Sequence, residues 1–224
     1  VKFIFQPAEE GPPEGEEGGA ILMVKEGVLE NPKVDVIFGM HIRCFQPLGT
    51  IAYKPKGMMA ASDWYTIRVT GRQAHGATPW RGIDPVLVSA QIIQGLQGII
   101  SRQTELTKEA AVISVGRISG GIRENIIPEE VEFSGTIRTL DSSMQKDIKR
   151  RIVLTATKIA EASGAQAAVT FSNKTMVVYN DPGLTTLVSG SFSKAAGVEN
   201  VQLMNADTGA EDFSFFQEKV PGYF

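Results

Sequence analysis

An α/β fold interrupted by an inserted ferredoxin-like α+β domain is the fold class that the sequence predicts, and three observations predict it. Residues 1–57 carry strand and helix patterns around a near-continuous apolar strand, as expected when both faces of a sheet are covered. Residues 58–176 change to the alternation of half-buried strands, with two helical patterns between them. Residues 177–224 return to the first pattern, so the middle domain interrupts an outer one.

The first segment reads as strand, loop, helix and strand. Residues 1–5 have strand-like composition, and residues 9–19 form a loop rich in Glu, Gly and Pro. The apolar residues within 20–29 recur at helical spacing, and the apolar run 34–40 predicts a buried strand. This order is typical of helices packed on a sheet.

The middle segment begins with a half-buried strand over residues 61–70, where polar and apolar side chains alternate. A helix follows, with Asp84 as its N-cap and Pro85 at its first position, and it runs to about residue 102. Gly95 and Gly98 within it indicate close packing against a neighbouring element.

The rest of the middle segment completes a split β-α-β pattern. Strands are expected near 111–118 and 130–140, a helix at the capping-box pattern Ser142-x-x-Gln145, and a last strand at 167–171. The helix should end at Gly164. After it, a helix over 184–196 and a strand over 201–204 belong to the outer domain.

Charge, hydropathy and cysteine count exclude several classes of protein. The 224 residues contain 22 Lys and Arg against 25 Asp and Glu, which gives no electrostatic footprint for a nucleic acid. The longest apolar runs fall far short of the roughly 20 residues of a membrane span. The lone Cys44 fits a reducing compartment. We therefore expect a cytoplasmic protein with neither nucleic acid nor membrane as partner.

The two ends of the sequence suggest an internal fragment. The chain opens without an initiator Met on a strand-like run, and it closes on residues 220–224, which resemble the start of a strand.

Two histidines and a pair of glutamates are the first candidates for chemistry. His41 follows the apolar run 34–40, and Glu9 and Glu10 follow residues 1–5, so all three lie at strand ends, where open α/β sheets place their ligands. A metal hydrolase needs one carboxylate on the metal and a second to take a proton from water. Taken singly, each motif is more often a solvated turn or loop start than part of a metal site.

The middle segment holds three further candidates. His75 stands in a turn with glycine near it on both sides, and Asn125 follows Gly120-Gly121. Arg138 alternates with Leu140 along its strand, and an Arg in such a position can hold a carboxylate bidentately. Each is an ordinary turn or edge residue when considered alone.

The combination of motifs is more specific than its parts. In order along the chain stand Pro-Ala-Glu9-Glu10, Gly39-Met40-His41, Gly71-x-x-x-His75-Gly-Ala, Gly120-Gly-x-x-x-Asn125-x-Ile-Pro, Gly135-Thr-Ile-Arg138 and Gly209-Ala-Glu-Asp-Phe213. Over its whole length the chain resembles the metal-dependent amidohydrolases that include hippurate hydrolases, N-acyl-amino-acid amidohydrolases and plant auxin-conjugate hydrolases. This family is related to aminoacylase and to certain carboxypeptidases.

The resemblance implies a zinc-peptidase-like catalytic domain, formed by residues 1–57 and 177–224, and a lid and dimerisation domain over 58–176. It makes Glu9 the general base and Glu10 and His41 ligands of two divalent metal ions, Zn or Mn.

The resemblance also assigns the residues of the lid. It makes His75 the residue that polarises the scissile carbonyl, often in the site of a partner subunit. Asn125 and Arg138 would hold the carboxylate of a small N-acyl amino acid or dipeptide, and the lid would form a homodimer.

The chain departs from the family pattern at several places. The family's upstream His-x-Cys-Gly-His-Asp-x-His segment and a later His ligand are not in this sequence, and Cys44 does not match them. Ala210 stands where Ser is common and Trp80 where His is often found, which leaves the substrate preference open.

We expect these 224 residues on their own to bind metal poorly and to be inactive or nearly so. A bound metal lowers the pKa of water from about 15.7 to about 7, which is on the order of 12 kcal/mol. Positioned acid-base groups contribute roughly 3 to 5 kcal/mol, so Glu9 cannot offset a lost metal.

Two alternatives stay open. The chain can be a non-catalytic fragment that serves as a binding or dimerisation module, or part of a carboxypeptidase that acts on short peptides. The sequence names neither the acyl group, nor the amino acid, nor the metal.

Overall fold

The computed structural model describes residues 1–44 and 46–224, and it divides the chain into two compact units. The first unit contains Val1–Ala61 and Thr175–Phe224, and the second contains Ser62–Lys174. Among the described residues, no helix combines the length and the apolar character that crossing a membrane requires. The catalytic and lid roles expected for the two parts of the chain remain proposals.

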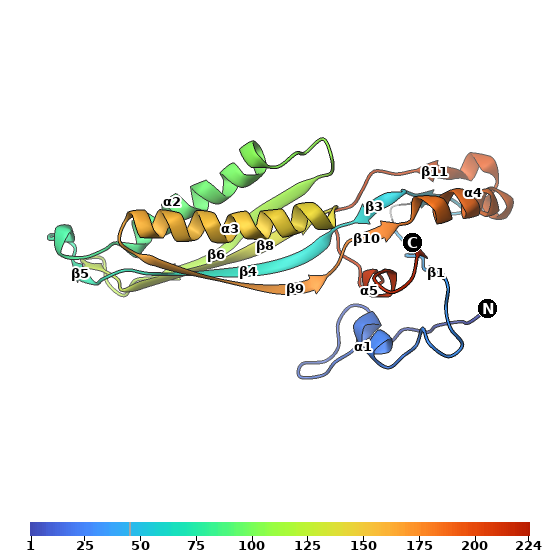
Figure 1. The fold of residues 1–224 in the computed structure, drawn as a ribbon, viewed down its shortest axis with the longest axis horizontal. Helices are drawn as coiled ribbons and strands as arrows, with labels where there is room; N and C mark the ends of the chain where they lie inside the picture. Colours follow the sequence, from blue (N-terminus) through green and yellow to red (C-terminus); the bar gives the residue numbers. More distant parts are fainter. Residues whose placement is uncertain (45) are drawn as a thin grey trace. The chain divides into compact units, whose positions relative to one another are not determined.

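The second unit has the element order that the sequence predicts. A four-stranded sheet has the strand order β6-β8-β4-β9, and β6 pairs antiparallel with β8. Helices α2 and α3 lie against each other and against this sheet (Figure 1). The elements are β4 (Ala61–Thr70), β5 (Ala74–His75), η1 (Pro79–Arg81), α2 (Pro85–Gly98), η2 (Ile99–Gln103), β6 (Ala111–Gly120), β7 (Ile126–Ile127), β8 (Glu130–Thr139), α3 (Ser142–Ala162) and β9 (Gln166–Thr175).

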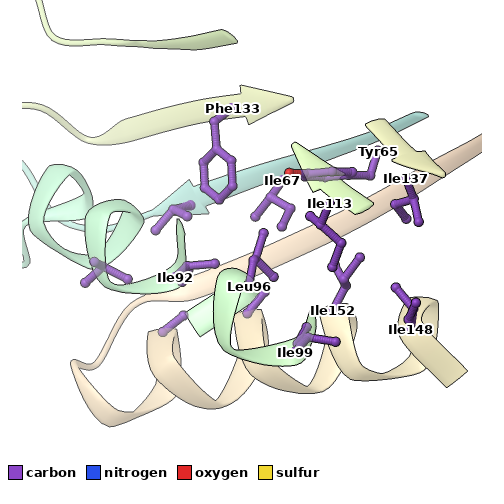
Figure 2. Packing of buried hydrophobic residues seen from close by; sticks show 14 of the residues in the cluster. Tyr65, Ile67, Ile92, Leu96, Ile99, Ile113, Phe133, Ile137, Ile148 and Ile152 are labelled. Carbon is purple, nitrogen blue, oxygen red and sulfur yellow. The ribbon is translucent and has the colours of Figure 1, made fainter. Parts of the chain in front are cut away.

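The core of this unit is built from the alternation in the strands and the apolar face of the helices. Tyr65, Ile67 and Val69 are buried on β4, whereas Trp64 before them and Arg68 between Ile67 and Val69 are exposed. Figure 2 shows side chains from the strands and from both helices pointing toward one another. Apolar side chains recur every two residues on one face of the strands and about every 3.6 residues on one face of the helices. Together they form one shared apolar layer.

The prediction for α2 is confirmed at its start and corrected toward its end. The Asp84 carboxylate accepts hydrogen bonds from the backbone of Val86 and Leu87. The α-helix ends at Gly98, and residues 99–103 continue as a π-helical turn. A Cβ at Gly95 would lie 2.8 Å from Thr155 of α3, so close packing is confirmed there. It is wrong at Gly98, where a Cβ would meet nothing within 4 Å.

The predicted capping box of α3 is wrong. The N-cap is Asp141, whose carboxylate accepts hydrogen bonds from the backbone of Ser143 and Met144. Gln145 is buried and donates instead to Asp63 in the core, so it cannot reach back to the cap. The end of the helix is as predicted, because Gly164 adopts a left-handed φ of 73°.

The first unit contains three short strand pairs and three α-helices within the described residues. β1 pairs parallel with β12, β2 pairs parallel with β11, and β3 pairs antiparallel with β10. The elements are α1 (Gly19–Lys25), β1 (Ile37–Phe38), β2 (Ile51–Tyr53), β3 (Lys56–Met59), β10 (Val178–Asn180), α4 (Pro182–Ala196), η3 (Val198–Asn200), β11 (Val201–Leu203), α5 (Ser214–Gln217) and β12 (Gly222–Tyr223). The mixed α/β class is confirmed.

Three predicted elements of the first unit differ from the structure. Residues 1–5 belong to no strand, because within the described residues no neighbouring strand pairs with them. The first helix ends at Lys25, just before Gly27 with its φ of 80°. The strand expected over 34–40 is reduced to Ile37–Phe38, the part that has β12 as a partner.

Candidate functional site

Three carboxylates meet in the first unit and form what we call the acidic cluster. One oxygen of each of Glu9, Glu211 and Asp212 lies within 4.8 Å of the other two. Glu9 comes from the end of the N-terminal extended segment, whereas Glu211 and Asp212 directly precede Phe213 and α5. The cluster thus joins parts of the chain that are about 200 residues apart in sequence. Gln6 and Asp212, which are hydrogen-bonded, are 206 positions apart.

A strained turn directs Glu9 into this cluster. Ala8 has a φ of 56°, which is uncommon for a residue with a Cβ, and the backbone of Gly11 donates to Ala8 O at 3.2 Å. The chain therefore bends at Ala8, just before Glu9. Glu10 is exposed and does not belong to the cluster.

Glu211 is the buried member of the cluster. Its side chain is 5% exposed, and the backbone of Phe213 donates to its Oε1 at 3.3 Å. Burial, and then the charge of Glu9, raise the pKa of Glu211 to about 7. Burial and a like charge both disfavour ionisation, so Glu211 holds a proton or a cation more readily than an ordinary carboxylate does.

His41 lies beside Glu211, as its position at the end of the predicted strand suggested, but that strand is not buried, since Phe38 and Met40 are exposed. Its Nδ1 is 3.3 Å from Glu211 Oε2, and its side chain is 42% exposed. The approach depends on Gly39, where a Cβ would come within 2.7 Å of the Phe213 ring. The end of β1 can therefore lie directly against the segment that carries Glu211.

Asp212 is held by hydrogen bonds that fix its position. Gln6 Nε2 donates to both of its carboxylate oxygens, at 2.7 and 2.8 Å, and the backbone of Ala20 donates at 2.7 Å. Helix α1 has Gly18 at its N-cap and no side-chain cap of its own, so Asp212 satisfies an N–H of its first turn. This makes Asp212 the link between the acidic cluster and α1.

The cluster opens into a cavity of about 1060 Å³. Its lining includes Glu9, His41 and Glu211, together with apolar side chains such as Ile4, Ile37 and Phe213. Two carboxylates and an imidazole that converge in this way form a donor set that suits Zn²⁺ or Mn²⁺. The residues therefore fit a divalent cation.

The remaining candidates lie in the second unit. His75 pairs with Ile126 across β5 and β7, and the backbone of Gly76 donates to Asn125 O at 2.8 Å, so His75 and Asn125 are neighbours. The backbone of Ala77 donates to His75 Nδ1 at 3.0 Å, which leaves Nε2 as the protonated nitrogen of the neutral ring. None of the contacts described for Arg138 joins it to these two residues.

Arg138 carries an unusual feature on β8. Its Nη1 atom is buried and has no hydrogen-bond partner among the described residues. A guanidinium N–H without a partner in a buried position is costly, and a carboxylate would satisfy it.

Reasoning from the sequence missed the roles of Glu211 and Asp212. Both stand in the Gly209-Ala-Glu-Asp-Phe213 motif, which contributed to the resemblance but received no function. The sequence did contain a signal, because two adjacent carboxylates precede the aromatic stretch 213–216. A carboxylate next to such an apolar stretch is a candidate for burial. Only the fold shows that Glu9 and His41 reach the same place.

The first unit therefore combines a mixed α/β fold with a candidate metal centre. The chain belongs to peptidase family M20/M25/M40, which its residues 1–224 match throughout.

Relatives of known name agree with this assignment. The chain is 36% identical to an N-acetylcysteine deacetylase of Bacillus subtilis over 226 residues, all of this chain and 56% of the relative. It is 37% identical to thermostable carboxypeptidase 2 of Saccharolobus solfataricus over 228 residues, all of this chain and 55% of the relative.

A solved structure shares both the fold and the family. This Bacillus subtilis protein, described as a dinuclear metal binding peptidase from the M20 family, matches with a TM-score of 0.76 and 32% identity. The match covers 98% of this chain and 53% of that chain. The chain thus spans about half the length of the curated relatives it matches.

Proposed function

We propose that the complete protein hydrolyses the amide bond of a small N-acyl amino acid at a site that holds two divalent ions, Zn or Mn. The observation that carries the proposal is the acidic cluster with His41 beside it, a set of carboxylates that no Lys or Arg of the described residues pairs with. The N-acetylcysteine deacetylase relative supports the substrate class.

The residues of the first unit divide into ligands and a base. His41 and Glu211 are the ligands that the geometry favours, and Glu10 is a ligand on the resemblance alone. A divalent ion bound there supplies polarisation of the scissile carbonyl and a lowered pKa for water. Glu9 takes a proton from the attacking water and later delivers it to the leaving amine.

The residues of the second unit act on the substrate in this proposal. His75 presents its Nε2–H to the developing oxyanion, a role that the contact between Ala77 N and Nδ1 supports. Asn125 and Arg138 hold the substrate carboxylate, and the buried Nη1 of Arg138 supports this. As the resemblance implies, a homodimer forms through the second unit, in which β6 and β9 are the edges of the sheet.

Replacing Glu9 by Gln in the complete protein tests the proposal. We expect turnover of N-acetyl amino acids to fall by about 10² to 10⁴ because the positioned base is lost, while metal content by mass spectrometry stays unchanged. Glu14→Gln in the exposed acidic loop is the matched control. Wild-type turnover in the Glu9→Gln variant would contradict the assignment.

A carboxypeptidase that acts on short peptides is a second candidate, favoured by the 37% identity to thermostable carboxypeptidase 2. The bond that is broken is the same, so the two candidates differ only in the acyl group. Parallel assays with N-acetyl amino acids and with dipeptides separate them by the ratio of kcat/KM values.

A non-catalytic binding or dimerisation module is the remaining alternative. We expect the 224 residues alone to hold metal poorly and to be inactive or nearly so, and to form dimers through the second unit. Metal analysis after dialysis against Zn²⁺ or Mn²⁺, with light scattering for the mass, tests both expectations. Stoichiometric metal together with robust turnover would contradict the first.

A further inference from the structure

An ion pair lies close to the acidic cluster without belonging to it. Arg43 stands two residues after His41 in the sequence, and Arg43 Nη1 donates to Asp207 Oδ2. Asp207 in turn stands four residues before Glu211. The side chains of the pair are 13% and 32% exposed, so solvent screens their interaction only in part. The pair therefore joins the segment that carries His41 to the segment that carries Glu211.

Asp207 uses its two carboxylate oxygens for two different segments. Its Oδ1 accepts a hydrogen bond from the backbone of Gly209 at 2.7 Å, which closes the turn that leads into Glu211. Its Oδ2 accepts from Arg43. The turn is tight, because a Cβ at Gly209 would lie 3.2 Å from Oδ1. The hydrogen bonds from Gly209 and Arg43 hold the pKa of Asp207 below its usual value, so the carboxylate stays charged.

The end of β3 supports both members of the pair. Asp207 N donates to Met58 O at 2.9 Å, and Ala60 N donates to Asp207 O at 3.1 Å. Arg43 Nη2 lies 3.4 Å from Met59 Sδ, which is a weak acceptor. Backbone bonds thus fix the turn of Asp207 to β3, and the Arg43 side chain fixes its own segment to that turn.

The contact between His41 and Glu211 is weak by itself. His41 Nδ1 lies 3.3 Å from Glu211 Oε2, at the long end of hydrogen bonding, and 42% of the His41 side chain is exposed. A second attachment of the His41 segment is therefore needed to hold the imidazole in place. In metal sites, residues behind the ligands commonly provide such an attachment. The pair of Arg43 and Asp207 stands in that position.

We propose that Arg43 and Asp207 are positioning residues, which keep His41 and Glu211 at the separation that a divalent cation requires. This inference rests on the proposed function, because it presupposes a cation at the acidic cluster. The two residues act through the segments that they join, without touching the cation. Ligands held in place lose less freedom when the cation binds, so loss of the pair should weaken cation binding without abolishing it.

The affinity of the complete protein for Zn²⁺ tests the proposal. The apoprotein is prepared with EDTA, and Zn²⁺ binding is measured at neutral pH by competition with a chromophoric chelator. We expect Arg43→Met to raise the Kd for Zn²⁺ by about 10-fold to 100-fold, as the loss of a residue behind a ligand typically does. Arg43→Lys keeps the charge and one contact with Asp207, so it should recover part of the affinity.

Asp207→Asn is the second variant, and it keeps an oxygen that accepts from Gly209 N. It should raise the Kd by a similar factor. The double variant with Arg43→Met should bind Zn²⁺ no more weakly than either single variant, because all three lose the same interaction. Urea unfolding with EDTA present verifies that each variant is folded under the conditions of the titration.

Arg68→Met is the matched control for the loss of an arginine. It removes an ion pair with Glu132 on the strands of the second unit, where Arg68 Nη2 lies 3.1 Å from Glu132 Oε2. This pair connects no part of the acidic cluster, so the Kd for Zn²⁺ should stay at the wild-type value.

Three results would overturn the proposal. They are a Kd within about twofold of the wild-type value in folded Arg43→Met and Asp207→Asn, strictly additive effects in the double variant, and an equal loss of affinity in Arg68→Met. The titration uses no substrate, so a failure of the Glu9 experiment would contradict the catalytic assignment and leave this result standing. A wild-type complete protein that binds no Zn²⁺ would overturn both proposals.

Discussion

Each unit buries one carboxylate among its described residues, and the two carboxylates have opposite surroundings. Asp63 in the second unit is 0% exposed and accepts hydrogen bonds from Gln145 at 2.7 Å and from Lys149 at 2.5 Å. Glu211 in the first unit is 5% exposed and has Glu9 and Asp212 as neighbours.

The difference teaches how to distinguish a structural carboxylate from a functional one. A buried charge is stable only when it is neutralised, and Lys149 does this for Asp63 from within the fold. Within residues 1–44 and 46–224, no Lys or Arg forms an ion pair with Glu9, Glu211 or Asp212, so the fold does not neutralise the acidic cluster as it does Asp63. Four substitutions test this comparison.

Asp63→Ala should have the largest effect on stability. It removes the carboxylate that Lys149 and Gln145 contact in the core, and breaking a buried pair costs about 3 to 5 kcal/mol. Urea unfolding of the 224-residue chain measures the change. A decrease of less than about 1 kcal/mol in the free energy of unfolding would show that solvent screens the interaction between Asp63 and Lys149.

Glu211→Gln should have the opposite sign when metal is absent. The pKa of Glu211 is raised in the folded state from 4.5 to about 7, so stability is full below pH 4.5 and falls as the pH rises through 7. At about 1.4 kcal/mol per pKa unit, the shift from 4.5 to about 7 corresponds to an expected gain of about 3 kcal/mol at pH 8.

Chelator and pH sharpen this second prediction. Unfolding of Glu211→Gln with EDTA present should show the gain at pH 8 and almost none at pH 4.5, whereas Glu14→Gln should change neither value. A variant that is less stable than the wild type at pH 8 would show that the cluster is neutralised from within the protein, like Asp63.

Asp212→Ala should lower stability by a smaller amount. It leaves the Gln6 amide and the Ala20 N–H without their acceptor, which costs about 1.5 kcal/mol. A double-mutant cycle with Gln6→Ala, measured by urea unfolding, should return a coupling of about 1 kcal/mol. Strictly additive effects would mean that the two side chains are not linked in solution.

Asp141→Ala should have the smallest effect, about 1 kcal/mol, because it removes the cap of α3. Burial opposes ionisation of Asp141, but hydrogen bonds from Ser143 and Lys108 prevail and lower its pKa to about 2. This stabilisation is present above pH 3.8 and is lost as the pH falls toward 2, so wild type and variant should converge there in thermal unfolding.

Much of the second unit could be predicted because its signals are local. Alternation along β4, the Asp84 cap and the stop at Gly164 each depend on a few neighbouring residues. The capping box failed for a nonlocal reason, since Gln145 is recruited by Asp63, 82 residues away in sequence. The prediction of close packing at Gly98 was wrong for a similar reason, because the sequence cannot show which glycine of a helix faces a neighbouring element.

The candidate site could be predicted only in part. Strand ends pointed to Glu9, Glu10 and His41, but the structure joins Glu9 and His41 through Glu211 and leaves Glu10 exposed. Whether Glu10 binds metal stays a prediction. Residues 1–5 had the composition of a strand, yet a strand also needs a neighbour, and propensity alone does not supply one.

The sequence by itself determined the family, the order of the elements and the residue types at the strand ends, because motifs, caps and periodicity are properties of short stretches. Tertiary structure alone decided which carboxylates share one site and which is neutralised. It brought Glu211 from near the end of the chain to Glu9 near its start, and it gave Asp63 a lysine. The physical reason is that charge interactions depend on distance in space and on burial, and only the folded chain fixes either of them.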